Sequence, residues 1–375
     1  MEKAILALEN GYFFYGWSFS SPVRETGGEV IFNTSMTGYQ EILTDPSYKG
    51  QIVVMTASEI GNYGINEEDS QSDRVWVNGF VVKDVPNVYS NYRAVESLKS
   101  YLEKNNVLGI FGVDTRAVVR ILREKGVMKG YIGVGDISPV EAVKKARSIP
   151  DISELNLVAE VSKPSVYRWT QKSWKWPKGY EEQTEFHYKV AVLDYGVKRD
   201  ILRLLADRNL ELICFPYNAS AEEVLSINPD GIFLSNGPGD PATLTYQIKQ
   251  IQKLIASEKP IFGICLGHQL LSWAFGSRTY KLEFGHHGGN HPVKNLKTGK
   301  VEITAQNHNY ATDETKLPQD VEITHINLND NTIEGMRHKN YPVFSIQHHP
   351  EAAPGPHDSF YIFDEFYNLI KECKK

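Results

Sequence analysis

Short apolar runs alternate with amphipathic segments through the second half of the chain. Continuous apolar runs, in place of an apolar-polar alternation, are typical of strands buried on both faces of a parallel sheet. The predicted strands are Val190–Leu193, Leu212–Pro216, Gly231–Leu234, Pro260–Ile264 and Pro342–Ile346, and the predicted helices are Arg199–Arg208, Ala242–Ser257 and Leu266–Phe275. Strands alternating with helices predict a mostly parallel sheet flanked by helices, with ligands at the carboxyl ends of the strands.

The first half of the chain mixes shorter patterns and predicts a separate mixed α/β domain. Its predicted strands are Ala4–Leu8, Glu29–Asn33, Gln51–Ala57 and Arg74–Val85, and its predicted helices are Ala94–Lys104 and Asp114–Lys125. The stretch between the two halves is rich in Pro, Trp and Glu and has neither the helical nor the strand period, so it is predicted to be a linker. We therefore expect an N-terminal domain over 1–160, a linker over 161–187 and a second domain over 188–375.

Composition excludes several classes of protein. Forty Lys and Arg against 46 Asp and Glu give a net charge of −6, and no basic tract stands out, so nucleic acid is not an expected partner. No apolar run approaches the roughly 20 residues that span a bilayer, so no membrane association is expected. The three cysteines, Cys214, Cys265 and Cys373, have no disulfide or metal-site spacing, so we expect no metal and a reducing, cytoplasmic location.

One cysteine stands at a junction between a predicted strand and a predicted helix. Cys265 is flanked by Gly263 and Gly267, which is the layout of a nucleophile elbow with sulfur in place of oxygen. Glycine is needed two residues away on each side because a side chain there would collide with the strand or the helix. The helix N-terminus stabilises negative charge and offers backbone N–H groups to an oxyanion. The alternative interpretation is a buried structural cysteine.

A thiol nucleophile needs a histidine that takes and returns its proton. His349 follows a predicted strand, and Pro350 separates it from Glu351, which could hold one ring nitrogen. His348 is the neighbouring competitor, expected to point elsewhere if the backbone is extended. Both could instead be surface histidines at a strand end. The histidine-rich segment 285–291 is predicted to line the cleft and not to bind a metal.

A third motif follows another predicted strand and brings the chain close to a known family. Together the three motifs resemble the class I, triad-type glutamine amidotransferases. The motifs are Gly237-Pro238-Gly239-Asp240, Gly263-Ile264-Cys265-Leu266-Gly267-His268-Gln269 and His349-Pro350-Glu351. The resemblance implies that the second domain has the fold of this glutaminase class.

The first half extends the resemblance over nearly the whole chain. It is similar to the N-terminal domain of the small subunit of carbamoyl-phosphate synthetase. The segments that carry the similarity are 32–48, 60–64 and 114–116, and the tail 354–358 agrees with it. The implied activity is that of the glutaminase subunit of a ligase complex, which serves arginine and pyrimidine biosynthesis.

The resemblance also implies a role for individual residues. Cys265 would attack the glutamine amide to give a thioester and ammonia, with His349 as acid and base and Glu351 orienting it. The residues implied to bind glutamine are Ser47, Gly237, Gly239, Leu266, Gln269, Asn307, Asn309 and Tyr310, and Gly239 and Leu266 are expected to supply the oxyanion amides. Asn309 and Tyr310 depart from the family pattern, which has Gly and Phe at these positions. Asn tolerates a left-handed backbone nearly as Gly does, and Tyr keeps the ring.

The chain has no Walker-type phosphate loop, so the resemblance implies a large partner subunit that receives the ammonia. ATP, Mg²⁺ and bicarbonate are expected on that partner and no cofactor on this chain, in a heterodimer or higher oligomer. Two alternatives stay open at this stage. One is an amidotransferase that serves a guanylate or anthranilate pathway, against which the N-terminal domain argues. The other is a non-catalytic scaffold that kept the fold, against which the presence of Cys265 and His349 argues.

Overall fold

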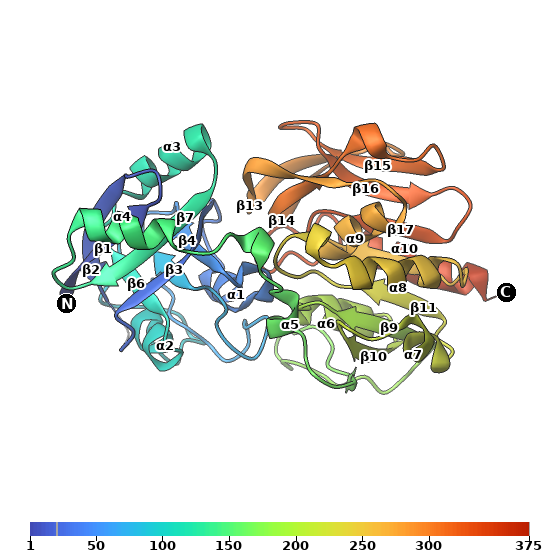
Figure 1. Ribbon diagram of the computed structural model, residues 1–375. Helices are drawn as coiled ribbons and strands as arrows, with labels where there is room; N and C mark the ends of the chain where they lie inside the picture. The colour runs from blue at the N-terminus through green and yellow to red at the C-terminus, as the bar shows by residue number, and fades with distance from the viewer. Residues whose placement is uncertain (20–21, 375) are drawn as a thin grey trace. The chain divides into compact units, whose positions relative to one another are not determined.

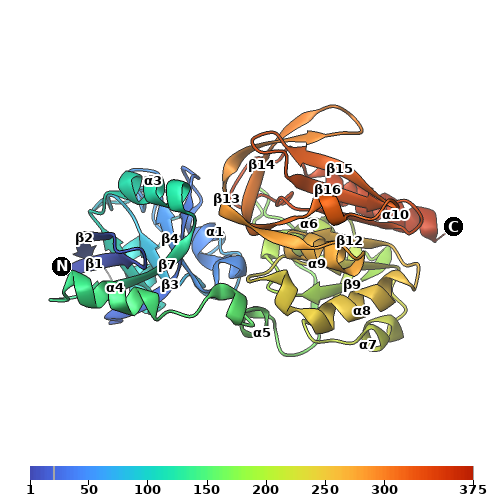
Figure 2. The same ribbon diagram turned by 45° about the horizontal axis from the view of Figure 1, so that its top comes forward.

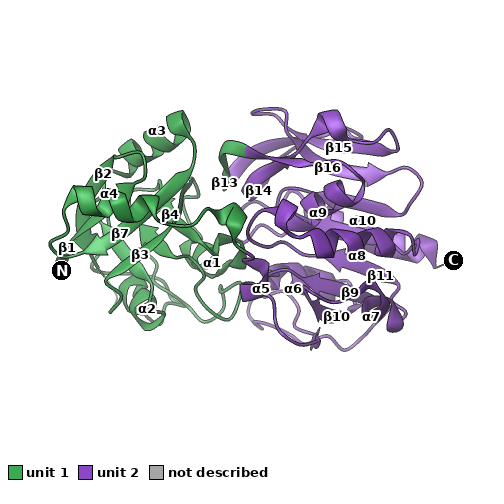
Figure 3. Ribbon diagram, viewed as in Figure 1, with its two compact units in different colours: residues 1–155, 282–288 green, residues 156–281, 289–375 purple. Residues whose placement is uncertain are grey.

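The computed structural model describes residues 1–19 and 22–374 and divides into two compact units (Figure 3). Unit 1 comprises residues 1–155 and 282–288, and unit 2 comprises 156–281 and 289–375. The segment 161–187, predicted as a linker, lies inside unit 2. Part of it, β8 (Tyr167–Trp169), pairs antiparallel with a strand of the large sheet.

Unit 1 is built on a closed barrel in which the strand order is β1-β2-β6-β5-β4-β3-β7 (Figure 1). Pairing of β1 with both β2 and β7 closes the barrel, so its strands present no free edge. The strands are β1 (Glu2–Leu8), β2 (Phe13–Ser18), β3 (Glu25–Asn33), β4 (Gln51–Met55), β5 (Gly79–Val81), β6 (Leu108–Phe111) and β7 (Met128–Val134).

The helices of unit 1 cover the two faces of these strands. Alternation along β1 explains how: Ala4, Leu6 and Leu8 pack in a cluster with residues of α3, whereas Ile5 and Ala7 pack with residues of α4. The helices are α1 (Tyr39–Thr44), α2 (Leu98–Lys104), α3 (Thr115–Lys125) and α4 (Pro139–Arg147), and the 3-10 turn η1 (Pro46–Tyr48) follows α1.

Unit 2 contains a ten-stranded sheet with the order β14-β13-β15-β16-β17-β12-β11-β9-β10-β8. The five strands from β17 to β10 are parallel, as the sequence predicts, and β13, β15 and β16 extend the sheet in antiparallel fashion. The bounds are β9 (Tyr188–Asp194), β10 (Leu210–Pro216), β11 (Gly231–Leu234), β12 (Ile261–Ile264), β13 (Thr279–Asn295), β14 (Val301–Thr312), β15 (Val321–Asn327), β16 (Ile333–His338) and β17 (Val343–Ile346).

Two layers of helices bury the parallel strands. On one face, Val190, Val192 and Phe262 pack with residues of α6 and α10; on the other, Ala191 and Ile261 pack with α7, α8 and α9 (Figures 1 and 2). The helices are α5 (Val158–Val161), α6 (Arg199–Asp207), α7 (Ala221–Ser226), α8 (Thr245–Ile255), α9 (Leu266–Ala274) and α10 (Tyr361–Cys373). Burial on both faces explains why these strands are continuously apolar. Within the described residues, no helix is both long enough and apolar enough to cross a bilayer.

Candidate active site

The order of the parallel strands reverses at one point in the sheet. The chain passes from β9 to β10 on one side and returns to β11 on the other side of β9, so the strand order reverses between β9 and β11. Ligands of open α/β sheets bind at such a reversal. All three sequence motifs follow β11, β12 or β17 at this edge, so the fold collects them where a ligand site is expected.

Cys265 occupies the turn from β12 to α9 with a strained backbone. Its φ of 52° and ψ of −102° are unusual for a residue with a side chain, and such strain is concentrated at functional sites. The backbone N–H of Cys265 donates to Ile346 O at 2.9 Å, and Gln269 N donates to Cys265 O at 3.1 Å. Cys265 is therefore fixed by the neighbouring strand and by the first turn of its own helix.

The two glycines of the elbow are required by space. A Cβ atom on Gly267 would lie 2.3 Å from Leu234 O, and one on Gly263 would lie 2.8 Å from the carbonyl of Gly267. Backbone atoms cannot retreat from such contacts without moving β11 or α9. The close packing of strand on helix holds Cys265 in its turn.

His349 and Glu351 form the second half of the site. Nδ1 of His349 lies 2.6 Å from Oε1 of Glu351, and the His349 N–H donates to Ala305 O at 2.9 Å. His349, Glu351 and the adjacent His348 are almost fully buried, which excludes the interpretation of surface histidines. His348 turns to a different carboxylate, with Nδ1 3.4 Å from Oε2 of Glu334, so the two adjacent histidines separate as expected.

Lys198 is a member of the site that the sequence analysis missed. Its ammonium donates to Glu351 Oε1 at 2.8 Å and to Ala352 O at 2.6 Å, and the side chain is 3% exposed. Lys198 follows β9 and precedes α6, at the same edge as the three motifs. A lysine in the turn between a predicted parallel strand and the next predicted helix is the signal that could have identified it.

Lys198, Glu351 and His349 form a buried row of neighbouring charged groups. Attraction between opposite charges dominates the electrostatics of this row. Burial alone would raise the pKa of Glu351, but the ammonium of Lys198 and then His349 lower it to about 2, against an ordinary value of 4.5. Burial alone would lower the pKa of His349, but the charges of Glu351 and Cys265 raise it above the ordinary value of 6.5. The row favours an ionised carboxylate and an imidazolium.

Nε2 is the ring nitrogen of His349 that faces the nucleophile. It makes no hydrogen bond of good geometry within the described part of the chain, yet the Cys265 sulfur is close enough to raise the pKa of the ring. The thiol instead donates to Asn307 O, with sulfur and oxygen 3.6 Å apart.

Several residues implied to bind glutamine lie beside this row. Asn307, Asn309 and Tyr310 are buried on β14, and Gln269 Nε2 donates to Tyr310 O at 2.9 Å. Asn309 lies within the extended strand and has no left-handed backbone. The glycine-like freedom that the sequence analysis invoked for Asn309 is therefore not needed, because any residue adopts this backbone conformation.

The Gly-Pro-Gly loop abuts the elbow. A Cβ on Gly237 would lie 2.8 Å from the Leu266 side chain and 2.2 Å from Tyr195 O, and Gly239 has a φ of 93°. Leu266 is the first residue of α9, so its N–H has no carbonyl partner within the helix. Ser47 lies in η1 of unit 1, and its assignment to glutamine rests on the resemblance alone.

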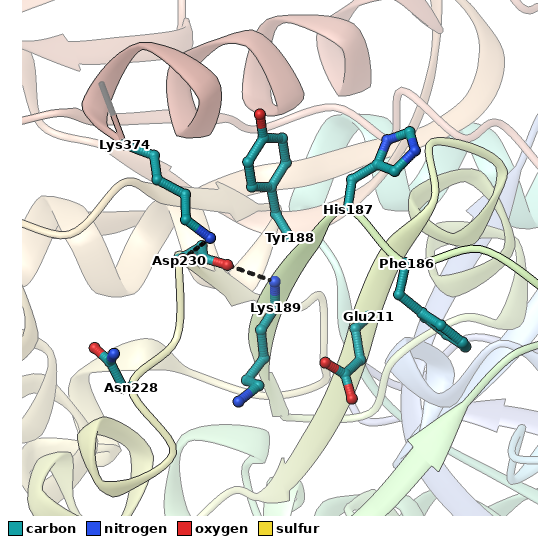
Figure 4. A pocket seen from close by; sticks show the side chains of 8 residues that line it. All are labelled: Phe186, His187, Tyr188, Lys189, Glu211, Asn228, Asp230 and Lys374. Carbon is teal, nitrogen blue, oxygen red and sulfur yellow. Dashed lines mark hydrogen bonds and ion pairs between the residues drawn. The ribbon is translucent and has the colours of Figure 1, made fainter.

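A surface pocket of about 310 Å³ lies at the other end of the same sheet (Figure 4). Lys189, Glu211 and Asp230 line it at the amino ends of β9, β10 and β11. Asp230 accepts from Lys189 N at 2.8 Å and pairs with the Lys374 ammonium at 2.9 Å. This pocket contains none of the predicted site residues.

Comparison with known proteins agrees with this geometry. Residues 191–369 match the family model of glutamine amidotransferase class-I, and residues 6–132 match that of the carbamoyl-phosphate synthase small chain, CPSase domain. Unit 2 thus contains a class I glutamine amidotransferase domain.

Full-length relatives narrow the class to one family. The chain is 56% identical to the carbamoyl phosphate synthase small chain of Aquifex aeolicus (strain VF5), over 99% of both chains. It is 50% identical to that of Syntrophotalea carbinolica, over 100% of this chain and 99% of the relative, and 48% identical to that of Escherichia coli (strain K12), with the same coverage. The chain belongs to the carbamoyl-phosphate synthase small chain family.

Proposed function

We propose that this site hydrolyses L-glutamine to glutamate and ammonia, with Cys265 as nucleophile, His349 as acid and base, and Glu351 as the group that orients His349. The observation that carries the proposal is the buried row Lys198–Glu351–His349 beside a strained cysteine at a helix N-terminus. Such a row supplies a proton carrier of fixed orientation next to a nucleophile.

The reaction then proceeds in two halves. The Cys265 sulfur, whose proton has passed to His349, attacks the side-chain amide carbon, and the oxyanion is stabilised by the N–H groups of Gly239 and Leu266. His349 gives its proton to the departing nitrogen, which leaves as ammonia, and a thioester remains on Cys265. Water, deprotonated by His349, attacks the thioester; glutamate leaves, and the proton returns to the sulfur.

Glutamine is proposed to bind between the motif loops and β14. Gln269 and the segment Asn307–Tyr310 carry a dense set of amide and carbonyl groups that suits an amino-acid substrate. Gly237, Gly239 and Leu266 would contact the reacting amide. Ser47 is assigned by resemblance.

A large partner chain is proposed to receive the ammonia. The relatives are named small chains, which supports such a partner, and we assign ATP, Mg²⁺ and bicarbonate to it. Carbamoyl phosphate made there would serve arginine and pyrimidine biosynthesis, and the assembly would be a heterodimer or a multiple of one. All three cysteines are free, which supports a reducing, cytoplasmic location.

Glutamate release from glutamine tests the proposal, with the chain assayed alone and with its large partner in the presence of ATP and bicarbonate. We expect Cys265→Ser to lower kcat by at least about 10³-fold, and Cys214→Ser, a buried cysteine on β10, to leave it unchanged. A wild-type complex that releases no glutamate would refute the activity. A fully active Cys265→Ser complex would refute the nucleophile.

A further inference from the structure

A buried carboxylate lies behind the active site and has no part in the mechanism above. Glu334, on β16, has no exposed surface. Its Oε1 accepts from Gln306 Nε2 on β14 and from Asn327 Nδ2 on β15, each at 2.9 Å. Its Oε2 lies 3.4 Å from Nδ1 of His348, which follows β17. One side chain thus links β14, β15 and β16 with the segment that follows β17.

The first set of contacts leads to the strand assigned to glutamine. Because a carboxylate only accepts hydrogen bonds, Gln306 must turn its NH₂ group to Glu334, and the other amide hydrogen meets Thr304 Oγ1 at 3.1 Å. The oxygen of the Gln306 amide therefore faces Nε2 of His308, 3.0 Å away. Rotating the amide by 180° would place this oxygen against the carboxylate.

This orientation settles the protonation of His308. Nε2 must donate to the Gln306 oxygen, and Nδ1 must donate to the carbonyl oxygen of Tyr310, 2.8 Å away, which can only accept. Protons on both ring nitrogens would make His308 an imidazolium whose charge balances Glu334 across Gln306. The same Tyr310 carbonyl also accepts from Gln269, another residue assigned to glutamine.

The second set of contacts leads to the catalytic histidine. The backbone N–H of Gln347 donates to the backbone carbonyl of Glu334 at 2.8 Å, and the His348 ring faces its carboxylate. His349 is the next residue along this segment. Glu334 thus contacts the strand that holds Asn307 and Tyr310 as well as the segment that holds His349.

We infer that Glu334 is a positioning residue of the proposed glutaminase, which acts through Gln306 and His308 on the Tyr310 carbonyl and so on the glutamine site. The inference rests on the proposed function for its substrate. A buried ion pair is weak evidence for a purely structural role, because apolar residues of similar size often stabilise a fold as well or better. The orientation of one backbone carbonyl, in contrast, requires this chain of donors and acceptors.

Glu334→Gln in the full chain removes the charge and keeps the shape. The matched control is Glu302→Gln, because Glu302 is another buried carboxylate of the same sheet and contacts Ser359 Oγ at 2.7 Å, outside this chain of contacts. We expect Glu334→Gln to raise the KM for glutamine about tenfold with kcat changed less than about threefold, which corresponds to one distorted hydrogen bond. Glu302→Gln is expected to leave KM unchanged. Equal KM shifts in both variants, or no shift in Glu334→Gln, would overturn the inference.

A second variant tests the path of the effect. Gln306→Met cuts the link while Glu334 stays in place, and we expect it to raise KM to a similar degree. The double variant is expected to be no worse than the more impaired single variant, since both interrupt one path. Independent, multiplying effects would contradict the path through Gln306.

A spectroscopic measurement separates this inference from the proposed function. In ¹⁵N-histidine-labelled full chain at neutral pH, we expect both ring nitrogens of His308 to be protonated in the wild type and one to be protonated in Glu334→Gln. A neutral His308 in the wild type would refute the inference even if glutamine is hydrolysed. A charged His308 in a chain without glutaminase activity would instead refute the proposed function.

Discussion

Lys198, Glu351 and His349, the proposed catalytic row, stabilise one another by alternating charge. Lys198 and Glu351 are separated by 153 positions in the sequence and by 2.8 Å between Nζ and Oε1. Both are withdrawn from water, so each charge is tolerated only because its partner is present. The proposed mechanism requires this ion pair, because Glu351 must be ionised to orient His349.

Removing the ammonium is therefore expected to cost stability as well as activity. We predict that Lys198→Met lowers the free energy of unfolding by about 3–5 kcal/mol, because Glu351 is left buried without its main counter-charge. Lys253→Met provides the control: its pair with Glu222 is exposed and should be worth less than about 1 kcal/mol. Urea denaturation of the three proteins measures the difference, and similar losses in both variants would contradict this account.

The same charges predict how stability depends on pH. The pKa of Glu351 is lowered on folding, so its contribution is complete above 4.5 and is lost as the pH falls through about 2. The pKa of His349 is raised on folding, so its contribution is complete below 6.5 and is lost as the pH rises through about 10. We expect the stability gap between the wild type and Glu351→Gln to be widest between about pH 4.5 and 6.5. Thermal unfolding across this range measures it, and a gap that widens above pH 7 would contradict the prediction.

At the scale of elements, the strand-to-helix turn shows why this local motif is readable in a sequence. Contacts between β11, β12 and α9 leave no room for a side chain at Gly263 or Gly267. These three elements lie close together along the chain. Apolar strands and amphipathic helices of this region are likewise local patterns, and β9 to β12, β17, α6, α8 and α9 lie where they are predicted. Local patterns predict elements well because a strand or helix face is set by neighbouring residues.

Two glycines near the ends of α9 allow the cost of steric contact to be compared with the cost of backbone strain. Gly267→Ala would place a Cβ 2.3 Å from a backbone carbonyl, and we expect a loss of about 3 kcal/mol in stability together with most of the activity. Gly276→Ala meets nothing within 4 Å but has a φ of 95°, so its expected cost is about 1 kcal/mol with activity retained. Melting temperatures and glutamate release decide this, and equal costs would show that contact at position 267 is relieved easily.

Other elements were not predictable from local patterns. β5 covers Gly79–Val81, whereas the apolar pattern predicts a strand over Arg74–Val85, and the short strands β2, β6 and β7 were not predicted. β6 has four residues and pairs with β5 and β2, far apart along the chain. The bounds of such strands are set by partners that come together only on folding, because strand preference depends on packing against neighbouring strands.

At the scale of the whole molecule, the sequence assigns one glutamine-binding residue to a unit that holds none of the others. Ser47 belongs to unit 1, whereas Cys265 and the remaining assigned residues belong to unit 2. We predict that Ser47→Ala raises the KM for glutamine about tenfold with little change in kcat, as expected when a hydrogen bond to the substrate is lost. Ser35→Ala, another buried serine of unit 1, is the control. An unchanged KM would mean that unit 2 binds glutamine without Ser47.

The sequence by itself determined the nucleophile turn, the histidine-glutamate pair and the parallel strands that carry them, because each is written in residues close together along the chain. Only the tertiary structure decided that Lys198 holds Glu351 and that Glu334 links three strands with the segment after β17. It also decided the antiparallel extension that carries β14. These features depend on which distant side chains share a buried, weakly polarisable interior, and burial is a property of the folded chain.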